Sequence, residues 1–251
     1  MSRTAFSMCD AKANEAGQQA GLLVSVRDVA EAQIAMRGGV DWIDLKEPGN
    51  GALGAVSGSV AQQVVDLVER RLPVSAAAGE LLEWPTSQAR ELLAVEHLQI
   101  LKLALAGCKN VPGWRQLWQE AASEIQESGK QLAAVAYADF GRAQAPAIEV
   151  VLAEAIELGL QTLLIDTFDK SAGPLTTHVP TATLASYLRK ARAAGLRTVV
   201  AGKLTPEIIR ELPLESVDLV AVRSAVTTGD REGPISPDRI KELSTILEAA
   251  Q

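Results

Sequence analysis

The sequence predicts a single-domain α/β protein, most economically a (β/α)8 barrel of the TIM type. Short apolar runs alternate with amphipathic segments about eight times along the 251 residues. The apolar runs are nearly continuous, as is typical of parallel strands that are covered on both faces. A hydrophobic fraction of 47% is enough for a full core, and no low-complexity linker divides the chain.

The apolar runs are the expected strands of the barrel. They cover residues 22–26, 41–46, 73–78, 98–104, 132–138, 162–166, 197–202 and 218–223. An open, doubly wound sheet is the main alternative fold. Such a sheet usually carries a glycine-rich fingerprint after its first strand, and here Arg27, Asp28 and Val29 stand at that place. The barrel is therefore the favoured prediction.

The segments between the strands show the signals of helices, which often begin with a capping residue or proline and end at glycine. Asp28 is the expected N-cap of the first helix, and Gly38-Gly39 is its expected end. The expected helices cover residues 28–38, 57–71, 86–95, 112–129, 146–159, 180–195, 205–212 and 236–250. Residues 1–20 are expected to form a flexible N-terminal extension, and residues 21–251 the catalytic barrel.

Composition excludes several classes of function. A net charge of −7 argues against a general binder of nucleic acid or of membrane surfaces. No apolar run approaches the roughly 20 residues of a membrane helix, and residues 1–20 lack the apolar core of a signal peptide. Cys9 and Cys108 form neither a disulfide framework nor a metal site, which favours a cytoplasmic protein. His97 and His178 lie too far apart to suggest a metal pair, so we expect neither metal nor cofactor.

Lysines at the ends of strands give the sharpest functional signal. Lys46 and Lys102 lie inside apolar runs, and Lys170 follows the strand at 162–166. Burying an unpaired ammonium is very costly, so strands rarely contain lysine. A lysine that becomes neutral near pH 7 is a nucleophile for carbonyl groups. The pattern therefore indicates Schiff-base chemistry on a small aldehyde or ketone.

Three carboxylates accompany these lysines at the end of the predicted barrel where active sites lie. Asp44 is two residues before Lys46 and therefore on the same side of the strand. Asp44 and Asp166 are candidate proton-transfer groups, and a buried structural ion pair is the alternative for Asp44. Asp139 is either a third proton-transfer group or the N-cap of the following helix.

A phosphate site is expected on the loops after the seventh and eighth strands, as in many such barrels. Glycine there allows the backbone to approach an anion, and basic side chains add charge. The candidate substrate- or phosphate-binding residues, which include one at the end of the first strand, are Ser25, Gly202, Lys203, Arg223 and Ser224. The glycine-rich loop at 49–54 could be a lid, a second anion contact or only a turn.

Several of these motifs together resemble the family of (5-formylfuran-3-yl)methyl phosphate synthase. The motifs run in order along the chain: LLVSV at 22–26, GVDWIDLKEP at 39–48, GALG at 51–54, VSAA at 74–77, YAD at 137–139, AG at 201–202 and VRSAV at 222–226, with Lys102, Asp166 and Lys170 between them. The chain departs from the family pattern at Ser171, Lys203 and Ser224.

The resemblance implies a barrel that condenses two glyceraldehyde 3-phosphates, with loss of phosphate and water. The product would be 4-(hydroxymethyl)-2-furancarboxaldehyde phosphate, a precursor of methanofuran in one-carbon metabolism, made by a carbon–oxygen lyase acting on phosphates. The family's Schiff-base lysine falls on Lys46 and its proton-transfer lysine on Lys102. Its supporting acid, second aspartate and second lysine fall on Asp44, Asp166 and Lys170.

Two other functions fit the same residues. A class I aldolase acting on a sugar phosphate would use the same Schiff base but stop after carbon–carbon bond formation. A non-catalytic barrel that binds phosphorylated metabolites would use its lysines as anion contacts. Helical segments with Leu81, Trp84, Trp114 and Trp118 suggest packing or a homo-oligomer. The expected partners are otherwise small triose phosphates, with no nucleic acid and no membrane.

Overall fold

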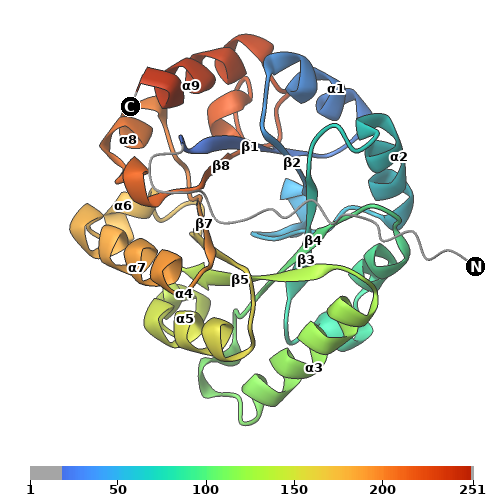
Figure 1. Ribbon diagram of the computed structural model, residues 1–251, viewed down its shortest axis with the longest axis vertical. Coiled ribbons are helices and arrows are strands. Elements are labelled where there is room, and N and C mark those ends of the chain that lie inside the picture. Colours follow the sequence, from blue (N-terminus) through green and yellow to red (C-terminus); the bar gives the residue numbers. More distant parts are fainter. Residues whose placement is uncertain (1–18, 250–251) are drawn as a thin grey trace, which may run out of the picture.

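A computed structural model of the protein describes residues 19–249 and contains a closed barrel of parallel strands (Figure 1). Each strand pairs with its neighbours in the sequence, and the last strand pairs with the first. The strands are β1 (Gly21–Val26), β2 (Trp42–Leu45), β3 (Val74–Glu80), β4 (Ile100–Ala104), β5 (Gln131–Tyr137), β6 (Thr162–Asp166), β7 (Arg197–Val200) and β8 (Leu219–Val222). The predicted barrel is confirmed. Of the extension predicted over residues 1–20, only Gln19 and Ala20 are among the described residues.

Helices form a ring outside the strands (Figure 1). The α-helices are α1 (Val29–Gly38), α2 (Gly58–Val68), α3 (Trp114–Glu127), α4 (Phe140–Ala143), α5 (Ile148–Glu157), α6 (Leu175–His178), α7 (Thr181–Ala193), α8 (Pro206–Glu211) and α9 (Pro237–Ala249). The 3-10 turns are η1 (Pro48–Asn50), η2 (Trp84–Thr86), η3 (Gln88–Ala94), η4 (Cys108–Asn110), η5 (Leu214–Ser216) and η6 (Ser224–Val226).

The sequence signals place most helices correctly. Asp28 caps α1 by accepting a hydrogen bond from the backbone N–H of Glu31, and Gly39 ends this helix with a φ of 84°. The α-helix predicted over 86–95 is wrong, because this segment forms the 3-10 turns η2 and η3. The segment begins at a cap on Ser87, as expected for a helix, but its backbone takes the 3-10 form up to Ala94.

Two apolar cores stabilise the barrel. Alternate strand residues point outward and pack under the helices, whereas the others fill the interior. Trp42 lies at the N-terminal end of the interior, where the Arg197 guanidinium stacks 5.0 Å from its ring centre. The apolar interior residues lie mostly in the lower and middle layers of the barrel. Polar side chains that point inward therefore gather at the C-terminal end.

The apolar side chains that suggested packing or a homo-oligomer are buried within the chain itself. Leu81, Trp84, Trp114 and Trp118 are all buried in the described structure. Helix packing explains these side chains, and the homo-oligomer stays a prediction. Among residues 19–249, none of the helices combines the length and the apolar character needed to span a bilayer.

A buried carboxylate takes part in a network that links the first and last strands of the barrel. Glu31, in the first turn of α1, accepts hydrogen bonds from the guanidinium groups of Arg27 and Arg223. Although burial acts in the opposite direction, these two arginines hold the pKa of Glu31 below its usual value. Arg223 also donates to the backbone carbonyl of Ser25 at 3.1 Å. The network therefore joins the C-terminal ends of β1 and β8.

We expect the variant Glu31→Gln to lower the free energy of unfolding by about 3 kcal/mol, because it leaves the buried Arg223 cation without its anionic partner. Urea unfolding followed by circular dichroism measures this loss. Glu69→Gln is the matched control, since Glu69 forms an exposed ion pair with Arg71 and should change stability by about 0.5 kcal/mol or less. Equal stability of the two variants would contradict a structural role for Glu31.

Candidate active site

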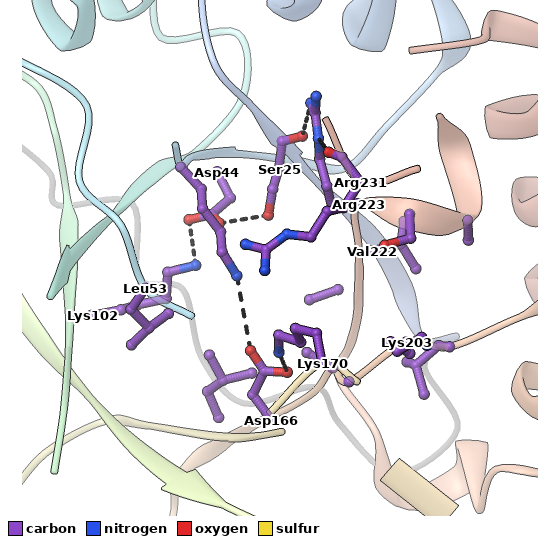
Figure 2. Close-up of a pocket in the computed structure, with 18 residues that line it drawn as sticks. Ser25, Asp44, Leu53, Lys102, Asp166, Lys170, Lys203, Val222, Arg223 and Arg231 are labelled. Carbon is purple, nitrogen blue, oxygen red and sulfur yellow. Dashed lines mark hydrogen bonds and ion pairs between the residues drawn. The ribbon is translucent and has the colours of Figure 1, made fainter. Parts of the chain in front are cut away.

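The predicted site residues, apart from Asp139, line one narrow cavity of about 50 Å³ at the C-terminal end of the barrel (Figure 2). Such a volume is on the order of four water-sized spheres. Asp44 and Lys46 come from β2 and its end, Lys102 from β4, and Asp166 from β6. The other predicted residues that line the cavity are Ser25, Lys170, Gly202, Lys203, Arg223 and Ser224.

Asp44 is the anchor of one half of the site. Its Oδ1 accepts a hydrogen bond from Ser75 Oγ at 2.7 Å and lies 2.5 Å from Lys102 Nζ. Its Oδ2 accepts from Ser25 Oγ at 2.9 Å. The strand register places Ser25 and Ser75 on either side of Asp44, so three neighbouring strands fix the carboxylate. Ser25, which we expected to contact substrate, therefore holds a catalytic candidate in place.

Asp166 anchors the other half. Its Oδ1 accepts from Lys170 Nζ at 2.6 Å and from the backbone N–H of Thr167 at 2.7 Å. Burial alone would raise the pKa of Asp166, but the cations of Lys170 and Lys46 outweigh this effect and lower it. Lys170 also donates to the backbone carbonyl and the hydroxyl of Thr167. Asp166 is therefore an anion, and Lys170 is its bound partner.

Lys46 differs from Lys102 and Lys170 in its contacts. Its Nζ lies 3.9 Å from Asp166 Oδ2, and among the described residues it makes no hydrogen bond. Burial is the largest influence on this amine. Asp166 raises the pKa of Lys46, the nearby Lys170 and Lys102 lower it, and the result is about 7 instead of 10.5. A substantial fraction of Lys46 is therefore neutral and nucleophilic at pH 7.

Asp139 is not among the residues that line the cavity, and it occupies the N-cap position of α4. Its carboxylate accepts hydrogen bonds from the backbone N–H groups of Phe168 at 2.7 Å and Asp169 at 2.8 Å. It precedes α4, but its side chain makes no capping bond to that helix. Asp139 instead holds the loop after β6, and thereby the segment that carries Lys170.

The loops after β7 and β8 form one wall of the cavity, as expected for a phosphate site. Gly202 has a φ of 111°, and a Cβ there would lie 2.9 Å from Thr167 Cγ2, so only glycine fits without strain. Lys203 is exposed at the rim, and Ser224 begins η6 beside it. These two loops can surround a small anion.

Arg223 has a different role from the one we expected. Its guanidinium donates to Glu31, to the carbonyl of Ser25 and to the carbonyls of Arg231 and Gly233. These bonds use all three of its nitrogen atoms. A contact between Arg223 and a phosphate would require one of them to break.

The sequence analysis missed several residues that shape the site. Ser75 could have been found, because it is a polar residue in an apolar strand next to the strand of Asp44. Glu80 is another missed residue: it accepts a hydrogen bond from Tyr137 of the YAD motif at 2.6 Å, and burial raises the pKa of both groups. Leu53 and Arg231 line the cavity from the loops after β2 and β8. Neither carries a local signal that distinguishes it from an ordinary loop residue.

The charged groups of the cavity do not form a recognisable metal site. Residues 19–249 contain no group of three or more His, Cys, Asp or Glu side chains that could hold an ion. What the arrangement offers is the Lys46 amine, which makes no hydrogen bond to the described residues, and two carboxylates that are each paired with a further lysine. This set can form an imine and move protons around it.

Comparisons with known proteins identify the family of the chain. A family model described as 4-HFC-P synthase matches residues 22–244. Proteins named (5-formylfuran-3-yl)methyl phosphate synthase from Methanococcus maripaludis (strain C7) and Archaeoglobus fulgidus are 31% and 30% identical to the chain over 228 residues. Each alignment covers 88% of this chain and 97% of the relative.

Solved structures support the fold. The 3-hexulose-6-phosphate synthase of Salmonella typhimurium superposes with a TM-score of 0.63 at 17% identity, covering 92% of this chain and all of that one. At this identity the likeness shows the barrel alone. The match of the family model and the identity to its curated relatives carry more: the chain is an enzyme of the 4-HFC-P synthase family.

Proposed function

We propose that the protein condenses two molecules of glyceraldehyde 3-phosphate into 4-(hydroxymethyl)-2-furancarboxaldehyde phosphate through a Schiff base on Lys46. One phosphate and two waters leave, which balances the atoms of two trioses against the furan product. The observation that carries the proposal is the state of Lys46, a buried amine with a pKa of about 7 among lysines that are bound to carboxylates. Methanofuran biosynthesis in the cytoplasm is the pathway that we propose for this product.

The first step is attack of the neutral Lys46 amine on a triose aldehyde, with loss of water. Asp166 Oδ2, 3.9 Å from Nζ, is positioned to transfer protons as the carbinolamine dehydrates. Asp166 and the Lys170 ammonium remain as a pair beside the new imine. The positive charge that develops on the imine then faces a carboxylate that is already ionised.

The second step is removal of the proton next to the imine carbon. Lys102 lies 2.5 Å from Asp44, so it can pass a proton to this carboxylate and then accept the substrate proton. The resulting enamine attacks the aldehyde of the second triose and forms the carbon–carbon bond. Elimination of one phosphate, ring closure and dehydration give the aromatic furan, and hydrolysis of the imine releases it.

The loops after β7 and β8 are the proposed site for the phosphate of the Lys46-bound triose. Gly202 and Ser224 bring backbone close to the cavity, and Lys203 supplies a positive charge at its rim. This contact would fix the triose so that its aldehyde reaches Lys46. Positioning of this kind contributes much of the rate in condensations of two bound reactants.

The variants Lys46→Ala and Lys46→Arg should both reduce furan formation to background. Alanine lacks an amine, and arginine stays protonated and cannot form the imine. Borohydride reduction with glyceraldehyde 3-phosphate, followed by peptide mass spectrometry, should attach the triose to Lys46 in the wild type only. Lys241→Ala, which removes an exposed lysine of α9, is the matched control. Turnover by either Lys46 variant would exclude Lys46 as the nucleophile.

The rate of imine formation should rise with pH through about 7, because only the neutral form of Lys46 attacks the aldehyde. Below that pH the rate should fall about tenfold for each pH unit. In Asp166→Asn the carboxylate that raises the pKa of Lys46 is gone, so the rise should move to lower pH. Initial rates of borohydride trapping at a series of pH values measure both profiles.

The exposed Asp66 of α2 provides the matched control for this experiment. Asp66→Asn should reproduce the wild-type profile. A wild-type rise centred above pH 9 would mean that Lys46 is an ordinary ammonium. A rise that moves to higher pH in Asp166→Asn would show that Asp166 is not an anion beside Lys46.

A further inference from the structure

The proposed reaction brings two phosphate groups into one site, and the further inference rests on that proposed function. The inner cavity has a volume of about 50 Å³, and the loops after β7 and β8 form the wall that we propose as its phosphate site. It has room for about one small carbon skeleton beside Lys46. The second triose therefore needs a separate place for its phosphate, outside the first one.

A second cavity of about 510 Å³ adjoins the inner one and shares two of its residues, Lys170 and Arg231. Its remaining walls come from the glycine-rich loop after β2, from the loop after β6 and from Arg142 of α4. Its lining includes the exposed side chain of Arg142. We call it the outer cavity.

The charges of the outer cavity favour an anion. Arg142 and Arg231 line the outer cavity together with a single carboxylate, that of Asp169, which is paired with Arg142, while Lys170 is paired with Asp166. Arg142 Nη1 lies 3.3 Å from Asp169 Oδ2, and this ion pair uses one of the five donors of the guanidinium. The Arg142 side chain is 61% exposed, so its other donors can turn toward a ligand.

Arg231 is held between the two cavities. Its Nη2 donates to the carbonyl of Gly51 at 2.9 Å, and this is the one hydrogen bond of its guanidinium to the described residues. Figure 2 shows Arg231 beside the inner site, whereas the neighbouring Arg223 is joined to Ser25. Arg231 thus keeps free donors where Arg223 has none.

Arg231 is bound by the loop at residues 47–54, after β2, and backbone hydrogen bonds fix this loop. The backbone N–H of Glu47 donates to the carbonyl of Gly54 at 2.9 Å, and a Cβ on Gly54 would lie 2.2 Å from the carbonyl of Glu47. The N–H of Gly79 donates to the carbonyl of Leu53 at 3.0 Å, which ties the loop to β3. The Gly51 carbonyl is therefore a fixed point, and Arg231 is oriented before any ligand arrives.

We propose that the outer cavity is a second phosphate subsite, in which Arg142 and Arg231 bind the phosphate of the second glyceraldehyde 3-phosphate. The first triose is bound as an imine to Lys46, with its phosphate on the loops after β7 and β8. The second triose then lies with its phosphate outward and its aldehyde toward Lys46. This arrangement brings the two carbon atoms that must join to the boundary of the two cavities.

The subsite can be tested with two readouts on one variant. Borohydride trapping on Lys46 as a function of glyceraldehyde 3-phosphate concentration reports the first triose alone. The rate of furan formation over the same concentrations reports both trioses. Arg142 is the residue to change, because it lines only the outer cavity and is exposed at the surface.

In Arg142→Gln the half-saturating concentration for furan formation should rise about tenfold or more, as expected when a charged hydrogen bond to phosphate is lost. The half-saturating concentration for trapping should stay within about twofold of the wild-type value. Arg142→Lys should recover part of the loss because it keeps the charge. Arg210→Gln, which changes an exposed arginine of α8, should leave both values unchanged.

Two results would overturn the subsite. Unchanged furan formation in Arg142→Gln would show that Arg142 does not bind the second triose. An equal rise in both half-saturating concentrations would show that Arg142 acts on the first triose or on the structure of the loops. Absence of trapping in the wild type would instead refute the proposed function, and the subsite would fall with it.

Discussion

Two buried lysines and the half-buried Lys170 beside only two carboxylates are the constraint on which the site depends. Lys102 is paired with Asp44 at 2.5 Å and Lys170 with Asp166 at 2.6 Å. The Lys46 Nζ makes no hydrogen bond to the described residues and lies 3.9 Å from Asp166 Oδ2. An unpaired charge in such a space is strongly destabilised, so the excess proton is the one that leaves. Burial first, and then the neighbouring Lys170 and Lys102, lower the pKa of Lys46 to about 7, although Asp166 raises it.

The barrel fixes the two carboxylates of the site in position. Serines on the two neighbouring strands fix Asp44, and the backbone N–H of Thr167 fixes Asp166. Glu31 and Arg223 join the ends of the first and last strands directly beside the cavity. Each carboxylate is thus held in a fixed orientation, as the proposed sequence of proton transfers requires.

The sequence predicts the barrel and singles out the lysines of the candidate site because both depend on local patterns. Continuous apolar runs mark parallel strands, and a lysine within such a run is a strong exception. The α-helix predicted over 86–95 was wrong because cap and proline signals do not distinguish a short 3-10 helix from an α-helix. Arg223 and Glu31 are 192 residues apart, so no local pattern shows that they bind each other. Asp139 was ambiguous for the same reason, since its backbone partners lie on the next loop.

The central claim is that one protein joins two trioses and carries the product through to a furan. The most direct test incubates the wild-type protein with glyceraldehyde 3-phosphate alone and follows the products by mass spectrometry and phosphorus NMR. The account predicts a furan aldehyde phosphate together with one inorganic phosphate for each furan formed. A six-carbon bisphosphate without furan would instead indicate a class I aldolase, and the complete absence of product would indicate a barrel that only binds phosphorylated metabolites. Either of these results would contradict the account.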